Sequence, residues 1–184
     1  MGYDLNRFVN VSILLSSRLE ASKLFEVILQ EAMIICNCDG GTIYSYENKC
    51  LSFKHMITKS KNITYNSEKD NEKIPSVPIQ KSYVCAYAYL ERQRLNIPDV
   101  YESDRFDFSG AKEYDSMNGY RTKSMLVIPL AVEHGGVVGV LQLINAMDSA
   151  GNVIPFTEEQ EHLVMALASM SALYIENRKL KALM

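Results

Sequence analysis

The chain has 184 residues, of which 47% are hydrophobic and 22% charged, and its net charge is −3. This length is most simply one domain with a buried core, and the mixed charges give no electrostatic case for binding nucleic acid or an anionic membrane. No apolar run approaches the roughly 18 residues that span a bilayer, and no signal-peptide core follows the start, so we expect a cytoplasmic domain.

The N-terminal region, residues 4–37, repeats apolar side chains at the spacing of an amphipathic helix. A polar stretch at Ser16-Ser17 and the Glu20-Ala21-Ser22 run interrupt this pattern. We therefore expect two helices, or one kinked helix, ending before Gly40-Gly41.

A β-hairpin is predicted next. Residues 41–46 (GTIYSY) are rich in β-branched and aromatic side chains, and residues 50–57 (CLSFKHMI) alternate apolar and polar ones. The following stretch, residues 59–76, carries seven charges and ends next to a proline. We expect this stretch to be a solvated loop.

An amphipathic helix is predicted over SYVCAYAYLERQ, residues 82–93, with Ser82 as a candidate N-cap. The run LNIPDVY, residues 95–101, then reads as a short strand. Pro98 should stop that strand, because proline cannot donate a ladder hydrogen bond.

The segment FDFSGAKEYDSMNGYRTKS, residues 106–124, mixes aromatic side chains with turn-forming and charged ones. Two apolar runs follow it, residues 124–132 and 137–145, with the turn sequence Glu133-His134-Gly135-Gly136 between them. Valines and a Gly-Gly turn favour a buried central β-hairpin over a helix.

A long C-terminal helix is predicted from about Glu158. Thr157 and Gln160 have the spacing of a capping box, and the acidic first turn suits the helix dipole. The order of elements therefore predicts an α+β fold, in which helices pack against one central, mainly antiparallel sheet.

The four cysteines and three separated histidines do not form a recognisable site. The cysteines lack C-x-x-C spacing, so we expect reduced thiols and no metal centre. Motifs of nucleophilic hydrolases, phosphate-binding loops and HExxH metalloproteases are also missing from the sequence. We therefore expect no catalytic residues.

Four short motifs follow one another along the chain: LNIPDVY, GYRTKSMLVIPL, GGVVGVLQLINA, and F-T-x-E before a predicted helix that contains ALAS. Together they resemble a GAF domain over about residues 5–180. The resemblance is strongest to bacterial signalling modules that precede HD-type phosphodiesterase, cyclase or histidine kinase output domains. It implies a single GAF domain, residues 1–184, with terminal helices at 4–37 and 157–183.

The resemblance also implies a ligand pocket on one face of the sheet, beneath a roof segment at residues 96–124. The ligand would be a cyclic nucleotide or another small polar metabolite. No cysteine lies in or beside this segment, so phytochrome-type bilin attachment is not expected.

Cyclic-nucleotide-binding GAF domains carry an N-K…F-x-x-x-D-E signature. This chain has Asn145, Phe156 and Glu161, but Ala146 replaces the lysine and Gln160 the aspartate. Since the lysine–aspartate pair is missing at both ends, the signature does not support cyclic-nucleotide binding.

The roof segment supplies the candidate ligand contacts: Phe106, Asp107, Phe108, Ser109, Tyr120, Arg121, Thr122 and Ser124. The two phenyl rings either line a pocket or fill it, and Asp107 either accepts a ligand hydrogen bond or forms a turn. Because cations cost more to bury than hydroxyls, we expect Thr122 and Ser124 to face inward and Arg121 and Lys123 to face solvent. Thr122 and Ser124 are therefore the favoured ligand contacts, and Arg121 is the less favoured candidate.

Two further interpretations remain. Some GAF-fold proteins reduce free methionine sulfoxide with cysteines, for which Cys50 and Cys85 would be the candidates here, although neither lies in a matching segment. The terminal LYIENRKLKALM, which includes Leu173, Leu180 and Leu183, suits a parallel helix pair. We therefore expect a homodimer formed through the terminal helices and joined to an output domain, and the alternative is a ligand-free dimerisation scaffold.

Overall fold

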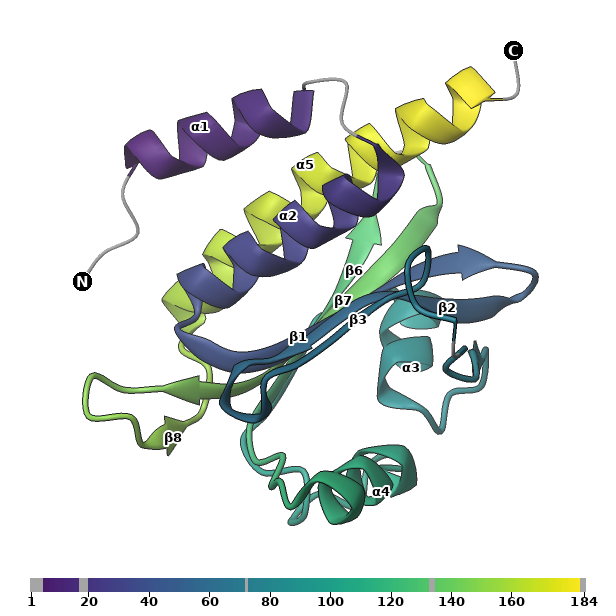
Figure 1. Cartoon of the computed structure of the whole chain (residues 1–184). Coiled ribbons are helices and arrows are strands. Elements are labelled where there is room, and N and C mark those ends of the chain that lie inside the picture. Colours follow the sequence, from purple (N-terminus) through teal and green to yellow (C-terminus); the bar gives the residue numbers. More distant parts are fainter. Residues whose placement is uncertain (1–4, 17–19, 72, 133–134, 183–184) are drawn as a thin grey trace.

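The computed structural model describes residues 5–16, 20–71, 73–132 and 135–182 (Figure 1). The elements in chain order are α1 (Leu5–Ser16), α2 (Ala21–Ile35), β1 (Cys38–Glu47), β2 (Cys50–Thr58), the 3₁₀ helix η1 (Lys59–Lys61), β3 (Ile63–Asn66), β4 (Val77–Pro78), α3 (Val84–Glu91), β5 (Leu95–Ile97), α4 (Ser109–Asn118), β6 (Met125–Ala131), β7 (Val137–Met147), β8 (Val153–Ile154) and α5 (Glu158–Ala182).

One sheet holds the molecule together. Its strand order is β3-β2-β1-β7-β6-β5, with β4 paired to β2 and β8 paired to β7. Each of these pairs is antiparallel. Both predicted hairpins, β1–β2 and β6–β7, are confirmed, and so is the α+β fold with a mainly antiparallel sheet.

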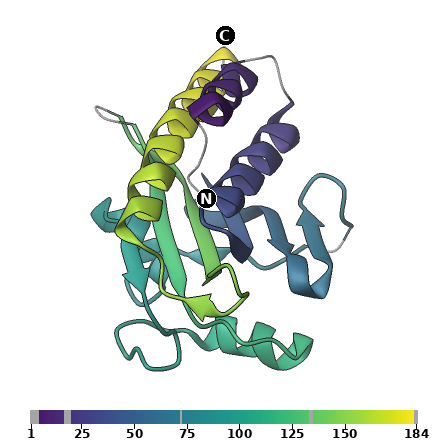
Figure 2. The same ribbon diagram turned by 90° about the vertical axis from the view of Figure 1, so that its left-hand side faces the viewer.

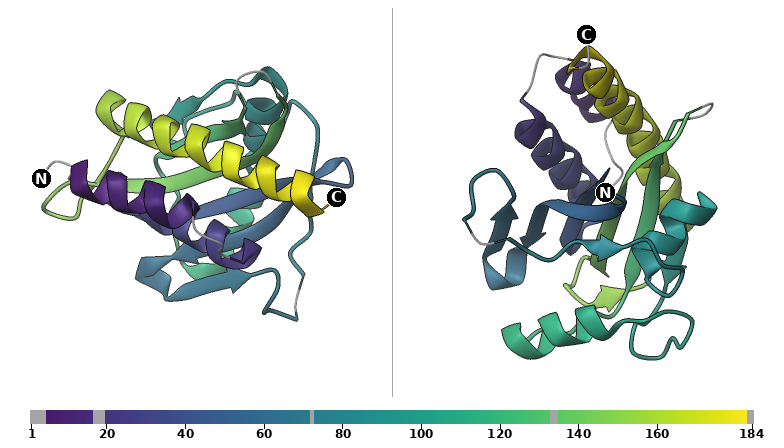
Figure 3. Two further views of the ribbon diagram at one scale, coloured as in Figure 1. Left: turned by 90° about the horizontal axis from the view of Figure 1, so that it is seen from above. Right: turned by 90° about the vertical axis from the view of Figure 1, so that its right-hand side faces the viewer.

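The sheet separates two layers. Helices α2 and α5 cover one face, with α1 beyond them, and α3 and α4 lie on the other face (Figures 1 and 2). The same arrangement is seen from above and from the opposite side in Figure 3. Alternation along β6 explains the two cores, because Leu126 and Ile128 face α2 and α5 while Met125 and Val127 face the α3 side.

The helices at the two ends mostly follow their sequence patterns. The predicted interruption separates α1 from α2. At the start of α5, the Thr157 backbone N–H donates to Gln160 Oε1 at 2.8 Å, and the Gln160 N–H donates to Thr157 Oγ1 at 3.3 Å, which confirms the capping box. The predicted helix limits at 4 and 183, Ser17, Leu183, and the turn residues Glu133 and His134 lie outside the described residues.

The predicted solvated loop at residues 59–76 is wrong in part. Its residues 59–61 form η1 and residues 63–66 form β3, which pairs with β2. Tyr65 and Asn66 are buried. The β-branched and aromatic run ITY has strand propensity, and the charges that surround it in sequence conceal this.

The roof segment contains a helix that the turn-rich pattern did not indicate. Helix α4 spans residues 109–118 and begins at Ser109-Gly110. Gly119 ends the helix at φ 55°, in the left-handed conformation that glycine adopts without a Cβ clash. Helix α3 also starts later than predicted, because Tyr83 and not Ser82 occupies its N-cap position.

The glycine pair expected to end the helical region lies inside β1 instead. A Cβ added to Gly41 would lie 2.9 Å from both Leu143 Cδ2 and Leu29 Cδ1. The glycine therefore allows α2 to approach the sheet closely at this point. In the part of the chain that the structure describes, no helix combines the length and the apolar character needed to cross a membrane.

Candidate functional site

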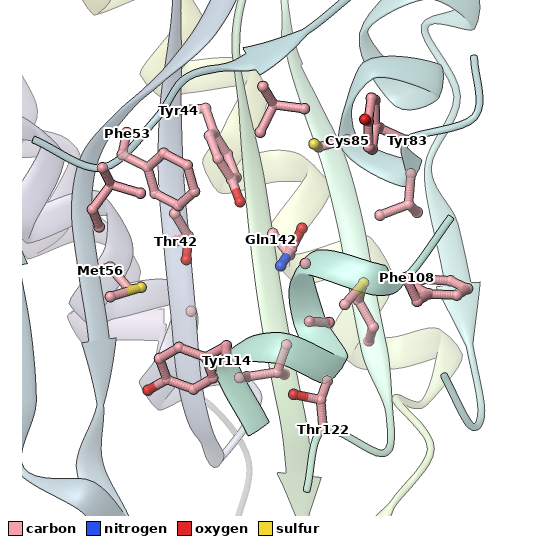
Figure 4. Close-up of a pocket in the computed structure, with 18 of the residues that line it drawn as sticks. Thr42, Tyr44, Phe53, Met56, Tyr83, Cys85, Phe108, Tyr114, Thr122 and Gln142 are labelled. Atoms are coloured by element: carbon pink, nitrogen blue, oxygen red, sulfur yellow. The ribbon is translucent and has the colours of Figure 1, made fainter. Parts of the chain in front are cut away.

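A cavity of about 430 Å³ lies on the sheet face opposite α2 and α5 (Figure 4). Its floor is formed by β1, β2 and β7, and its walls by the start of α3, residues 74–78 and helix α4. This volume is typical of small-molecule pockets in proteins. The predicted pocket between the sheet and the roof segment therefore corresponds to an open space in the described residues.

The floor comes from alternate residues of neighbouring strands. Thr42 and Tyr44 of β1 face the cavity, whereas Ile43 between them belongs to the core against α2 and α5. Gln142 of β7 lies directly across the strand pair from Thr42. Phe53 and Met56 of β2 continue the floor on the far side of β1.

The cover is largely apolar. Helix α4 contributes Ala111 and Tyr114, and the residue before it, Phe108, closes one end. Tyr83 and Cys85 at the start of α3 face the same space. Aromatic rings thus approach the cavity both from the sheet and from its cover.

Few polar groups face this space. The Tyr44 hydroxyl interacts with the Thr42 side chain, and burial holds the pKa of Tyr44 well above its ordinary value. The Gln142 side chain is half-buried, and its amide makes no hydrogen bond within the described residues. Asp107 and Glu113 are the charged residues of the described lining, and both are exposed at the surface.

Phe106 and Phe108 were expected either to line the pocket or to fill it, and their positions differ. Phe108 lines the cavity, whereas Phe106 is buried beside it. The Phe106 ring contacts Phe108 and Tyr87 edge-on, with centroids 6.1 and 5.2 Å apart. Their rings therefore leave the cavity open.

Asp107 and Ser109 form a turn at the start of α4. The Ser109 N–H donates to Asp107 Oδ1 at 2.9 Å, and hydrogen bonding from the Ser109 hydroxyl, together with this N–H, lowers the pKa of the Asp107 carboxyl. Asp107 lies at the rim of the cavity, and Ser109 is exposed outside its lining. The turn chemistry that sequence reasoning left open for Asp107 is present.

Thr122 and Ser124 face inward, as expected, and both are buried. Thr122 lines the cavity, but its hydroxyl donates to Asp115 Oδ1 at 2.8 Å. Ser124 lies outside the lining, and its hydroxyl accepts from the Ala146 N–H at 3.2 Å. Lys123 is exposed, as expected.

Tyr120 and Arg121 lie outside the lining and hold the roof segment in place. The Tyr120 hydroxyl donates to Asp39 Oδ2 at 2.7 Å, and burial together with this carboxylate raises the Tyr120 pKa. Arg121 pairs with Asp99 at 3.3 Å and stacks over the Tyr101 ring at 3.9 Å. A ligand role for these residues stays a prediction, and the contacts they make here are structural.

Asn145 occupies the asparagine position of the GAF signature, and its side chain holds the end of the roof segment through hydrogen bonds. Its Oδ1 accepts from the Lys123 N–H at 2.7 Å, while its amide nitrogen donates to the Tyr120 hydroxyl and the Arg121 carbonyl, each at 2.8 Å. Its φ of 57° is in the left-handed region, which asparagine tolerates better than most residues.

The two replaced positions of the signature have other roles. Ala146 is fully buried in the core against α2 and α5. The Gln160 amide donates to the Cys36 carbonyl at 2.9 Å, near the end of α2. Glu161 accepts hydrogen bonds from Asn96 and Arg94, each at 2.7 Å.

The buried thiols do not favour a nucleophilic role. Burial raises the pKa of the cavity-lining Cys85 to about 12, so it is protonated at neutral pH. Burial similarly raises the pKa of Cys38 to about 12. No cluster of histidine, cysteine and carboxylate side chains that could hold a metal ion occurs among the residues described.

Most of the floor, including Tyr44 and Gln142, was not among the residues predicted from the sequence. Alternation along β1 and β7 places these side chains opposite the leucines and isoleucines of the same strands. That signal identifies two faces, but it does not say which face is covered by helices and which by a cavity.

Comparisons with known proteins agree with this geometry. The family model described as GAF domain matches residues 20–175. A Drosophila melanogaster protein named dual 3′,5′-cyclic-AMP and -GMP phosphodiesterase 11 is 30% identical over 138 residues, which cover 72% of this chain but 9% of that protein. The chain therefore spans about a tenth of the length of this curated relative.

Solved structures share the fold. The GAF domain of an Acinetobacter phosphoenolpyruvate-protein phosphotransferase has a TM-score of 0.71 at 14% identity, covering 98% of this chain and 97% of that one. A GAF domain/HD domain protein from Geobacter sulfurreducens has a TM-score of 0.64 at 15% identity, covering 92% and 98%. At these identities the likeness is one of fold.

Proposed function

The chain belongs to the GAF domain family, and from this premise we propose that it is a regulatory module that binds a small molecule in the cavity. The single observation that carries the proposal is the open cavity of about 430 Å³ between the sheet and the roof segment. GAF domains are signalling and sensor modules, so the expected role is regulatory rather than catalytic.

Strands β1 and β7 would carry the signal across the sheet. On β1, Thr42 faces the cavity while Ile43 packs against the terminal helices. Gly41 lines the cavity and is in close contact with Leu29 of α2. A ligand that shifts β1 would therefore shift α2, because a close-packed core transmits small displacements.

The terminal helices would pass this shift to a partner. Helix α5 exposes Leu173 and Leu180, and α1 exposes Val9, at 50%, 55% and 48% of their surfaces. Burial of these side chains against a second copy would form the proposed homodimer. Because the curated relative is far longer than the match, we place an output domain in the same polypeptide.

The same exposed leucines support a second candidate function, a dimerisation scaffold that needs no ligand. In that case the cavity would be filled or collapsed on dimerisation. The two candidates differ in whether any small molecule stabilises the domain.

A thermal-shift screen of a mixed metabolite library would test the proposal. We expect at least one compound to raise the melting temperature of the wild-type chain. It should leave the cavity-filling variant Ala111→Phe unchanged, provided that variant melts cooperatively. Compounds that stabilise both proteins equally, or no stabilising compound at all, would leave the scaffold as the better description.

Transmission is tested separately in the dimer. A Leu180→Cys variant in a Cys50→Ser background would report helix pairing through the rate of intermolecular disulfide formation. We expect a stabilising compound to change this rate in the wild-type cavity and not in Ala111→Phe. An unchanged rate with bound ligand would show that α5 does not respond.

A further inference from the structure

We infer that the cavity selects an uncharged, flat ring that carries a neighbouring hydrogen-bond donor and acceptor, with the Gln142 amide reading that edge. Anions, cyclic nucleotides included, are selected against. This inference rests on the proposed function, since it names the class of ligand that the regulatory cavity takes.

The charges around the cavity oppose an anion. Within the described lining, the charged residues are Asp107 and Glu113, and no lysine, arginine or histidine faces the space. A phosphodiester placed there would lose its hydration without gaining a cation, and it would lie near two carboxylates. A neutral ring carries no net charge for the carboxylates of Asp107 and Glu113 to repel.

The starts of α3 and α4 do not replace the missing cation. The Ser109 N–H, at the first residue of α4, already donates to the Asp107 carboxylate at 2.9 Å. At α3, the first two residues of the helix, Val84 and Cys85, line the cavity. Helix ends favour an anion by much less than its desolvation costs, so these donors suit a carbonyl oxygen better than a phosphate.

Gln142 supplies the polar recognition. It lies near the middle of β7, paired with Thr42 on one side and Val127 on the other, and its side chain points into the cavity (Figure 4). Its amide has a donor and an acceptor side by side, and neither makes a hydrogen bond to another described residue. A ring lactam, in which an N–H stands next to a C=O, is the complementary edge.

The remaining walls suit the faces of such a ring. Phe53 and Met56 lie on the sheet side of the cavity, and Phe108 and Tyr114 on the cover side. Aromatic faces and a polarisable thioether bind flat apolar surfaces without requiring charge. Thr42, opposite Gln142, lies on the same floor, where its side chain interacts with the Tyr44 hydroxyl.

Isothermal titration calorimetry with matched probes would test this. The neutral lactams are uracil, thymine, hypoxanthine and guanosine, and 3′,5′-cyclic GMP is the anionic match to guanosine, with the same base. We expect at least one neutral lactam to bind, and cyclic GMP to bind at least tenfold more weakly than guanosine. Ala111→Phe should abolish binding of the lactam that binds.

Variants of Gln142 test whether its amide recognises the N–H and C=O groups of the lactam. Gln142→Leu and the nearly isosteric Gln142→Glu should each weaken the bound lactam by tenfold or more. Gln80→Leu, at an exposed glutamine outside the lining, should leave its affinity unchanged. Only a Gln142 variant that melts cooperatively is counted, and the Glu variant serves as the test if the Leu variant does not fold.

Three results would overturn the inference. They are cyclic GMP binding as tightly as guanosine, lactam affinity unchanged in both Gln142 variants, and no binding by any of the four lactams. None of these rejects the proposed function, which fails only if no compound of any charge stabilises the wild-type cavity selectively.

Discussion

The Tyr114 hydroxyl lies 2.7 Å from the Thr58 hydroxyl, and this contact joins helix α4 to the end of strand β2. Both residues line the cavity. The hydrogen bond therefore fastens the cover to the floor at one end of the ligand space.

Removing this hydrogen bond should loosen the cover. We expect Tyr114→Phe to lower the free energy of unfolding by about 1 kcal/mol, the usual net value of one such bond. Urea denaturation would measure the change. The control is Tyr174→Phe, whose half-buried ring packs against the core with α2 and α5. Equal losses in the two variants would argue against a specific role for the Tyr114–Thr58 contact.

Asn145 should be the most sensitive polar position of the roof segment. Asn145→Ala removes three hydrogen bonds and leaves a non-glycine residue at φ 57°, so we expect a loss of roughly 2–4 kcal/mol in unfolding free energy. Asn145→Gly removes the same bonds but relieves the backbone strain. The glycine variant should therefore be the more stable of the two, and chemical denaturation of both would show whether the strain contributes.

Gly139 tests the close approach of β1 and β7. A Cβ at this position would overlap the Tyr44 carbonyl oxygen of β1, next to the Ser45–Gly139 pair. Since backbone atoms cannot move aside as a flexible side chain can, we expect Gly139→Ala to destabilise the domain by about 3 kcal/mol or more, or to prevent folding.

Gly110→Ala is the matched control for that substitution. Apart from its chain neighbours and the backbone of its own helix, no heavy atom lies within 4 Å of a Cβ added to Gly110, which lies in α4. Helix propensity then predicts a gain of about 0.5–1 kcal/mol. Thermal melting of the two variants should move in opposite directions, and a similar melting temperature for Gly139→Ala and wild type would show that the strands can separate at little cost.

The parts of the fold that sequence reasoning predicted are those with a local signal. The β6–β7 hairpin has two apolar runs and a glycine turn, and the capping box at Thr157 has a four-residue pattern. Helix α4 lacks such a signal, because it covers a cavity instead of a solid core. Among its residues, Asp115 is the one that the structure buries, so its apolar stripe is missing.

The position of the cavity was predictable from the sequence, but most of its lining was not. The roof segment was expected to cover a pocket, and Phe108 and Thr122 do line it. Gln142 and Tyr44 could not be identified, since their importance depends on which face of β7 and β1 meets the cavity. That choice is set by the packing of α2 and α5 on the other face, which no short motif encodes.

His55 should make the stability of the domain depend on pH. It is buried on β2, its Nδ1 has no hydrogen bond in the described structure, and burial lowers its pKa below the ordinary 6.5. The charged groups that face it are Glu26, Lys69, Lys23 and Asp70. Because the unfolded chain binds a proton at this histidine more readily than the folded one, stability should fall as the pH drops below about 6.5. The loss should be complete once the pH passes below the lowered pKa of the folded state.

Urea denaturation between pH 7.5 and 5 would measure this dependence. We expect His55→Leu to flatten the curve, because it removes the group whose proton affinity differs between the two states. His162→Leu, at an exposed position of α5, should leave the slope as in wild type. If His55→Leu keeps the wild-type slope, another group must account for the acid sensitivity. If stability instead rises as the pH falls, the buried imidazole is stabilised in its charged form, and the carboxylates of Glu26 and Asp70 outweigh its burial.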